Sequence, residues 1–155
     1  MSEPMSEHKA VVEWQRSGAF ERTLYSRVHT MRFDSGIRIA GNAAPGNIPA
    51  TVPAAPGVDP EQAFVAALSA CHMLWFLDRA CKAGHTVDRY TDNASGRLER
   101  NAAGKMAITL VTLRPAVEFG TAAPSAVQLR ALHDDAHEHC FIANSVSSQI
   151  DIEPQ

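Results

Sequence analysis

Residues 59–84 read DPEQAFVAALSACHMLWFLDRACKAG, and this stretch decides the fold. Asp59 is a helix-capping residue type, Pro60 suits the first helical position, and Gly84 is typical of a helix end. The middle of the stretch is apolar on nearly every side, which is typical of a helix buried all round. In a chain of 155 residues, such burial favours a sheet on one side and a second subunit on another. We therefore predict a long central helix from Pro60 to about Ala83.

Strand-forming segments lie on both sides of this helix, and a second helix follows over residues 125–139. The expected strands are residues 9–15, 22–33, 37–40, 90–100, 105–119 and 146–152. Residues 90–100 and 105–119 form a long hairpin, in which Pro115 indicates a bend or an edge. The expected order is therefore strands, a helix, strands, a second helix and a strand. This order predicts an α+β fold with antiparallel sheets, and it differs from the alternating strands and helices of a nucleotide-binding fold.

The length predicts a single domain over residues 1–155. Residues 1–8 are expected to be a flexible tail. Residues 41–58 are rich in proline and alanine and are expected to form an irregular loop. A loop of that length is either a lid or binding loop, or a surface excursion without a function.

Composition and motifs exclude several classes of protein. The formal net charge is -3 and no basic run is present, which argues against a nucleic-acid partner. Neither a signal peptide nor a membrane span is recognisable, so we expect a soluble cytoplasmic protein. Phosphate-binding glycine motifs are absent, so we expect no nucleotide cofactor.

Three cysteines, Cys71, Cys81 and Cys140, are the candidates for chemistry. An odd, low count without a secretion signal argues against a structural disulfide framework. Cys71 lies in the middle of the apolar helix, where a cysteine usually packs as a small hydrophobic residue. It lies too far from the helix N-terminus to be activated there, so a reactive Cys71 needs a nearby cation. Spacing alone leaves open whether Cys71 and Cys140 are paired or unrelated.

Histidines gather near the end of the second helix, at His133, His137 and His139. With His72 and the two cysteines they are one possible zinc-ligand set. The more common role of such histidines is to be solvated or to satisfy carbonyls at the negative end of a helix. We expect no metal.

Two motifs resemble those of one protein family, that of the osmotically inducible and organic hydroperoxide resistance proteins (OsmC/Ohr). DPEQAFVAALSAC, residues 59–71, is similar to the family's helix motif, which ends in a cysteine. AHEHCFIANS, residues 136–145, is similar to its second cysteine motif. Their order, with strands and a helix between them, makes the resemblance specific.

The resemblance implies an OsmC-like fold, an intertwined homodimer and a peroxidase that reduces organic hydroperoxides with two cysteines. Cys71 matches the peroxidatic cysteine and Cys140 the resolving one. Glu61 matches a glutamate that holds the catalytic arginine, for which Arg27 is the best match and Arg22 and Arg32 are competitors. An external dithiol, either a lipoyl protein or a thioredoxin-like protein, re-reduces the disulfide.

Helix geometry adds one prediction of its own. Glu61 and Cys71 are separated by about 15 Å along one helix, so they can meet only between antiparallel copies of that helix. Their midpoint is Ala66, and small residues around it permit close approach. We therefore predict a two-fold axis near Ala66.

Two functions remain as alternatives to the peroxidase: a protein of the same fold that binds a small ligand or senses redox state, and a zinc-binding structural protein. An apolar pocket lined by Phe64, Met73, Trp75 and Phe141 would suit fatty or aryl hydroperoxides. The same side chains are equally compatible with an ordinary core.

Overall fold

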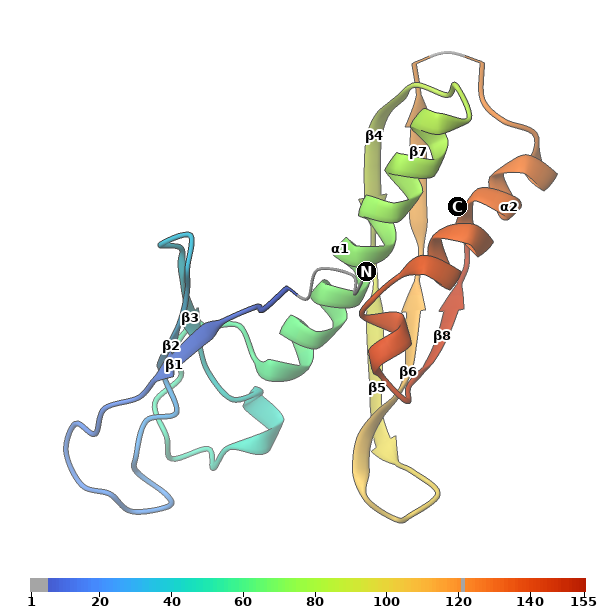
Figure 1. The fold of residues 1–155 in the computed structure, drawn as a ribbon. Helices are drawn as coiled ribbons and strands as arrows, with labels where there is room; N and C mark the ends of the chain where they lie inside the picture. Colours follow the sequence, from blue (N-terminus) through green and yellow to red (C-terminus); the bar gives the residue numbers. More distant parts are fainter. Residues whose placement is uncertain (1–5, 121) are drawn as a thin grey trace. The chain divides into compact units, whose positions relative to one another are not determined.

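A computed structural model describes residues 6–120 and 122–155, and the chain divides into two compact units (Figure 1). The N-terminal unit comprises residues 1–60 and the C-terminal unit residues 61–155. A flexible tail is expected over residues 1–8. Of these, residues 1–5 lie outside the described part of the chain, and residues 6–8 are exposed. In the described part of the N-terminal unit, Val52 is the buried hydrophobic residue. A unit with so small a core does not meet the usual criterion for a separate domain, so the single domain stays a prediction.

The N-terminal unit is a three-stranded antiparallel sheet in the order β1-β2-β3. Its strands are β1 (Ala10–Glu13), β2 (His29–Phe33) and β3 (Arg38–Gly41). The strand expected over residues 22–33 is therefore shorter than predicted, because only its last five residues pair with β1 and β3. Residues 14–28 leave the sheet and carry a cluster of aromatic side chains instead.

The segment between β3 and the first helix is irregular, as predicted for residues 41–58, but it is held at both ends. Gly41 and Val58 form a parallel bridge, and the Asn42 side chain donates to the Ala55 carbonyl at 2.9 Å. A Cβ atom at Gly57 would lie 2.7 Å from the carbonyl carbon of Gly41, so this close backbone approach requires glycine. A short 3-10 helix, η1 (Pro45–Asn47), lies within the segment.

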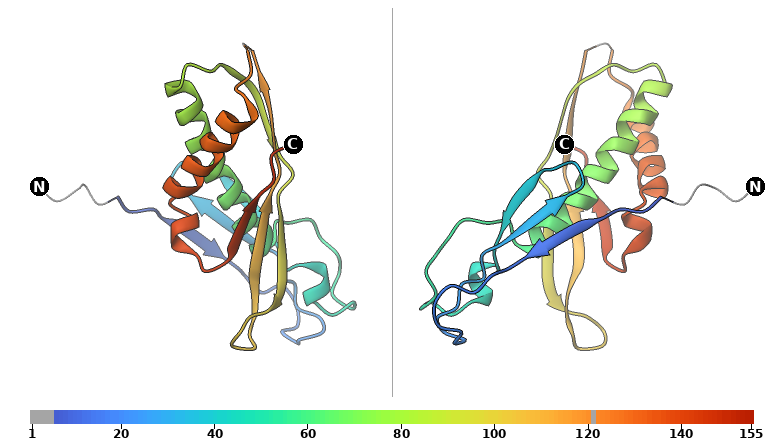
Figure 2. Two further views of the ribbon diagram at one scale, coloured as in Figure 1. Left: turned by 90° about the vertical axis from the view of Figure 1, so that its right-hand side faces the viewer. Right: turned by 60° about the vertical axis from the view of Figure 1, so that its left-hand side comes forward.

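The C-terminal unit combines two helices with two sheets, and Figure 2 shows both helices on the same face of the strands. The helices are α1 (Pro60–Lys82) and α2 (Ala126–His139), and a short 3-10 helix, η2 (Ala143–Ser145), follows α2. One sheet has the order β4-β7, with β4 (Val87–Asp92) and β7 (Pro115–Phe119); the other has the order β5-β6-β8, with β5 (Ser95–Arg100), β6 (Met106–Leu113) and β8 (Gln149–Ile152). This is a mixed α+β fold with two helices and antiparallel sheets, as predicted.

Local signals explain where the helices begin and end. Pro60 opens α1, and Gly84 beyond its end has a φ of +84°, a conformation that glycine adopts without strain. Ser125 and Gln128 form a reciprocal capping box at the start of α2, which satisfies two N–H groups that the helix itself leaves free.

The expected long hairpin is broken into two sheets. The chain passes from β4 to β5 over residues 93–94, and from β6 to β7 at Arg114, immediately before the bend predicted at Pro115. One pair also departs from the antiparallel pattern, because β8 runs parallel to β6. Between these two strands the chain returns through α2, and a crossover of this kind joins parallel strands.

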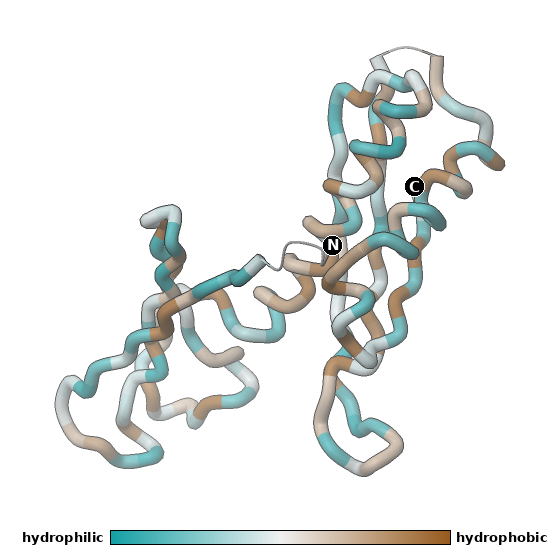
Figure 3. Tube along the Cα trace, in the orientation of Figure 1, coloured by the Kyte–Doolittle hydropathy of each residue, from teal (hydrophilic) through white to brown (hydrophobic). Residues whose placement is uncertain are grey.

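In the single chain α1 is buried along one stripe, made by Leu68, His72, Phe76 and Ala80. Figure 3 shows that apolar residues dominate the middle of α1, between polar residues at its ends. By length and composition α1 passes as a membrane span, a test that the core helix of a soluble protein passes equally well. Its other apolar positions are not buried, and the Leu74 side chain is 63% exposed. The single chain thus buries α1 along one stripe, and the all-round burial predicted for this helix stays a prediction.

Candidate functional site

The C-terminal unit brings Cys71 and Cys140 together. Cys71 lies in the middle of α1 and is partly buried, whereas Cys140 is the C-cap of α2 and is only 1% exposed. The Cys140 thiol is hydrogen-bonded to Cys71, and both thiols are free. The fold thus places in contact two cysteines that the sequence holds far apart.

Burial is the main cause that raises the pKa of the Cys140 thiol to about 11, and the hydrogen bond to Cys71 is the second cause. At neutral pH Cys140 is therefore protonated and donates its S–H to the Cys71 sulfur. The backbone N–H of Ala143 in turn donates to the Cys140 sulfur at 3.4 Å, which orients this side chain. Cys140 is therefore held as a protonated thiol in contact with Cys71.

Glu61 lies in the first turn of α1, within the C-terminal unit. Its Oε2 atom is buried and finds no hydrogen-bond partner within residues 6–120 and 122–155. Burial of a carboxylate oxygen is unfavourable without a donor or a cation. Glu61 therefore offers an acceptor to a group that the described chain does not provide.

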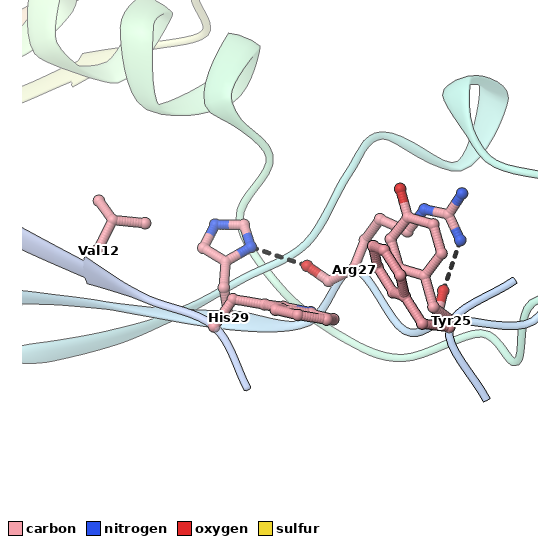
Figure 4. Close-up of a pocket in the computed structure, with 6 residues that line it drawn as sticks. Val12, Tyr25, Arg27 and His29 are labelled. Atoms are coloured by element: carbon pink, nitrogen blue, oxygen red, sulfur yellow. Dashed lines mark hydrogen bonds between the residues drawn. The ribbon is translucent and has the colours of Figure 1, made fainter. Parts of the chain in front are cut away.

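Arg27 lies in the N-terminal unit, just before β2, and its side chain is held firmly. It donates to the carbonyl oxygens of Tyr25 and Arg22, the latter at 2.8 Å, and its guanidinium lies 3.5 Å from the centre of the Tyr25 ring (Figure 4). Among the described residues Arg27 has no ion-pair partner, whereas Arg32 lies 3.5 Å from a carboxylate oxygen of Glu13. Arg22, the third candidate, also has no ion-pair partner among the described residues, so ion pairing separates Arg27 and Arg22 from Arg32.

A pocket of about 380 Å³ opens beside Arg27 in the N-terminal unit (Figure 4). It is lined by Val12, Trp14, Phe20, Tyr25, Arg27 and His29. The rings of Trp14, Phe20 and Tyr25 contact one another, with centroids 4.9 to 6.1 Å apart. A largely apolar lining with one cation suits an organic ligand. None of these residues belongs to the apolar pocket that we expected from the sequence.

Two histidines that the sequence does not connect form a buried pair between α1 and α2. Nε2 of His72 lies 3.0 Å from Nδ1 of His133, the two rings are nearly parallel, and His133 also stacks on Phe76. Burial lowers the pKa of each histidine to about 4, so both are neutral at pH 7. The sequence does not reveal this pair, because nothing local relates positions 61 residues apart.

Asp135, Glu138 and His139 are the residues of the described chain that could jointly hold a metal ion, since their ligand atoms lie within 4.8 Å of one another. Asp135 already accepts an ion pair from Arg79 at 2.9 Å and a contact from His139 at 3.1 Å. Ordinary ion pairing at the surface of α2 accounts for this group. It differs from the zinc-ligand set considered from the sequence, of which it shares only His139.

Comparison with known proteins agrees with the two motifs. The family model described as OsmC-like protein matches residues 53–155. An OsmC-like protein of unknown function from Vibrio cholerae is 49% identical, covers 97% of this chain and 100% of its own, and superposes with a TM-score of 0.90.

More distant solved structures share the fold. The organic hydroperoxide resistance protein OhrB of Bacillus subtilis is 20% identical, with 95% of this chain and 98% of its own covered and a TM-score of 0.68. An organic hydroperoxide resistance protein from Elizabethkingia anophelis is 16% identical, with 96% and 95% covered and a TM-score of 0.67. None of the curated proteins matches the chain. The chain belongs to the family of OsmC-like proteins.

Proposed function

We propose that the protein is a thiol-dependent peroxidase that reduces organic hydroperoxides to alcohols in oxidative-stress defence. The observation that carries this proposal is the hydrogen bond between the Cys140 thiol and Cys71. A sulfenic acid that forms beside a second thiol condenses with it to a disulfide, which is the chemistry of two-cysteine peroxide reduction. The names of two solved relatives, which are organic hydroperoxide resistance proteins, support the choice of substrate.

In the first step the Cys71 thiolate attacks the outer oxygen of the hydroperoxide. The new S–O bond forms as the O–O bond breaks, so sulfur loses two electrons and the peroxide gains them. Cys71 becomes a sulfenic acid, and the departing alkoxide takes up a proton to give the alcohol.

In the second step the Cys140 sulfur attacks the sulfenic sulfur of Cys71. The S–S bond forms, and the hydroxyl group leaves with the Cys140 proton as water. An external dithiol, supplied by a lipoyl protein or a thioredoxin-like protein, then exchanges with the disulfide and is itself oxidised. Both thiols are regenerated, so the cycle needs no bound cofactor.

Arg27 and Glu61 assist the first step in this proposal. A guanidinium stabilises a thiolate and also the charge that develops on the leaving oxygen. Two observations support these roles: Arg27 lacks a carboxylate partner among the described residues, and Glu61 has a buried oxygen without a donor there. Glu61 holds the arginine, and the arginine acts on Cys71.

The active form is a homodimer in this account. Ala66, Ala67 and Ala70 are exposed on α1, and Leu74 is 63% exposed. Apolar positions of this kind on a core helix favour a covering partner. A second copy that packs antiparallel against α1 covers them and places its own Glu61 near Cys71.

A cytoplasmic location suits a chain with three free cysteines, because that compartment keeps thiols reduced.

The pocket beside Arg27 favours a second candidate function, the binding of a small apolar ligand without turnover, with thiols that sense redox state. Turnover distinguishes the two functions.

The direct test follows cumene hydroperoxide consumption in the presence of a dihydrolipoyl donor. The peroxidase consumes many equivalents per chain, and Cys71→Ser abolishes the reaction. Cys81→Ser is the matched control, because Cys81 is exposed at the end of α1 and has no role in the cycle. Failure of the wild-type protein to turn over, or unchanged turnover in Cys71→Ser, rejects the peroxidase in favour of the binding protein.

A further inference from the structure

The buried histidine pair lies between the two helices that carry the thiols. His72 directly follows Cys71 on α1, and His133 lies on α2, which ends at Cys140. The two rings are 1% and 0% exposed, and the Nε2 to Nδ1 distance of 3.0 Å is that of a hydrogen bond. Each helix therefore contributes one thiol and one histidine to the same interface.

We propose that His72 and His133 are positioning residues that hold α1 against α2 so that Cys140 reaches the sulfur of Cys71. This inference rests on the proposed peroxidase function. The hydrogen bond is directional and buried, so it fixes how far one helix can slide or rotate on the other. His133 also stacks on Phe76, at 4.3 Å between ring centroids, and this contact fixes the orientation of the His133 ring in the hydrogen bond.

The other polar contact between the helices is weaker as a constraint. Arg79 and Asp135 lie 2.9 Å apart, but their side chains are 24% and 40% exposed. An ion pair in contact with water is screened and adds little. Trp75 also contacts the rings of His139 and Phe141, but these are ring contacts and not buried hydrogen bonds. The histidine pair is thus the buried polar link of this interface in the described chain.

The outer nitrogens support a role beyond packing. Nδ1 of His72 and Nε2 of His133 are buried and have no hydrogen-bond partner within the described residues. Two apolar side chains would fill the same space without leaving polar atoms unsatisfied. As a packing element alone, the histidine pair is therefore less favourable for folding than two apolar side chains. Alignment of the adjoining thiols is a benefit that would offset this cost.

Alignment matters at one step only. The Cys71 sulfenic acid has two fates: it condenses with the Cys140 thiol, releasing water, or it attacks a second hydroperoxide, releasing alcohol and becoming a sulfinic acid. Condensation depends on the approach of Cys140, whereas the formation and the overoxidation of the sulfenic acid depend on peroxide. A misplaced helix therefore slows the first fate and leaves the second unchanged.

The test compares His72→Leu with His72→Gln. Leucine removes the hydrogen bond, whereas the glutamine side-chain amide reaches about as far as Nε2 and retains it. Val111→Ala, at a fully buried position on β6, serves as a control for general loss of stability. Each variant is titrated with cumene hydroperoxide, and mass spectrometry measures the ratio of disulfide to sulfinic acid. A single-turnover measurement gives the rate of sulfenic acid formation.

His72→Leu is expected to overoxidise at a roughly tenfold lower peroxide concentration, since small misplacements of reacting groups cost large factors in rate. The rate of sulfenic acid formation stays near that of the wild type, and His72→Gln and Val111→Ala keep the wild-type ratio. His133→Leu and His133→Asn repeat the comparison from the other helix. An unchanged ratio in both leucine variants overturns the inference.

A peroxide-independent measurement separates this inference from the proposed function. Glutathione redox buffers give the effective concentration of the Cys71 thiol toward Cys140, and the leucine variants are expected to lower it by about tenfold. If the wild-type protein forms this disulfide but does not react with hydroperoxide, the peroxidase is rejected and the positioning role stands. If the leucine variants keep the wild-type effective concentration, the positioning role is rejected whether or not the protein is a peroxidase.

Discussion

The Cys140 thiol donates a hydrogen bond to Cys71, from the C-cap of one helix to the middle of another. In the proposed cycle this contact joins two thiols with different tasks. Cys140 is buried and has a pKa of about 11, so it keeps its proton at neutral pH. Cys71 is more accessible than Cys140, so in the proposed cycle it meets the peroxide first.

Cys140 is the resolving thiol of the proposed cycle, so its replacement is expected to interrupt the cycle after the first step. Cys140→Ser is expected to reduce one equivalent of hydroperoxide and then to accumulate sulfinic acid on Cys71, because no second thiol protects it. Intact mass after stepwise addition of peroxide measures this, with Cys81→Ser as the control. Continued turnover of Cys140→Ser with the lipoyl donor would show that Cys140 is not the resolving residue.

Loss of the guanidinium weakens the first step. Arg27→Gln is expected to lower kcat/KM for cumene hydroperoxide by about 10²-fold, since one charge-stabilising donor is typically worth this much. Arg32→Gln removes a partly exposed arginine that already pairs with Glu13, so activity should stay within about twofold of the wild type. The opposite ranking of the two variants would assign the catalytic role to Arg32.

The predicted two-fold axis is open to a cross-linking test. In a chain without native cysteines, Ala66→Cys is expected to form a disulfide with its own copy under mild oxidation. Ala102→Cys, exposed in the turn between β5 and β6, stays monomeric on a non-reducing gel. A monomer by light scattering, or equal cross-linking at both positions, would contradict the proposed packing of α1.

Acid is expected to destabilise the protein through its buried histidines. Burial is the main cause that lowers the pKa of His72 and His133 to about 4. His137 lowers the pKa of His72 further and Asp92 opposes the shift, whereas His72 and Arg130 lower the pKa of His133 further. The unfolded chain, whose histidines titrate near 6.5, therefore binds more protons than the folded one between these values. Stability is complete above about pH 6.5 and falls as the pH decreases toward 4, with a slope of at most about 1.4 kcal/mol per pH unit for each histidine.

Urea unfolding between pH 4 and pH 8 measures this slope. The double variant His72→Leu/His133→Leu should show a flatter dependence over the same range. A slope in the double variant equal to that of the wild type would assign the acid sensitivity to other groups.

Local signals predicted the helices well. Pro60 and Gly84 for α1, and Ser125 with Gln128 for α2, act through neighbouring backbone groups, so the sequence alone reveals them. The break of the hairpin at Arg114 depends instead on tertiary packing, and only the bend at Pro115 was indicated in advance.

The site was predictable only in part. Cys71 and Cys140 were identified from family motifs, since no spacing rule brings together residues on separate helices. The pairing of His72 with His133 has no local signal at all, because a histidine in an apolar helix has the same sequence pattern whether or not it finds a partner. The aromatic pocket was missed because residues 22–28 were assigned to a strand, whereas they leave the sheet.

The most direct test of the account is a single reaction of the reduced protein with one equivalent of cumene hydroperoxide, followed by peptide mass mapping. The account predicts one equivalent of cumyl alcohol and a disulfide between the peptides that contain Cys71 and Cys140. Unreacted peroxide with both cysteines still reduced, or alcohol formed with Cys140 left as a free thiol and Cys71 unmodified, would contradict it.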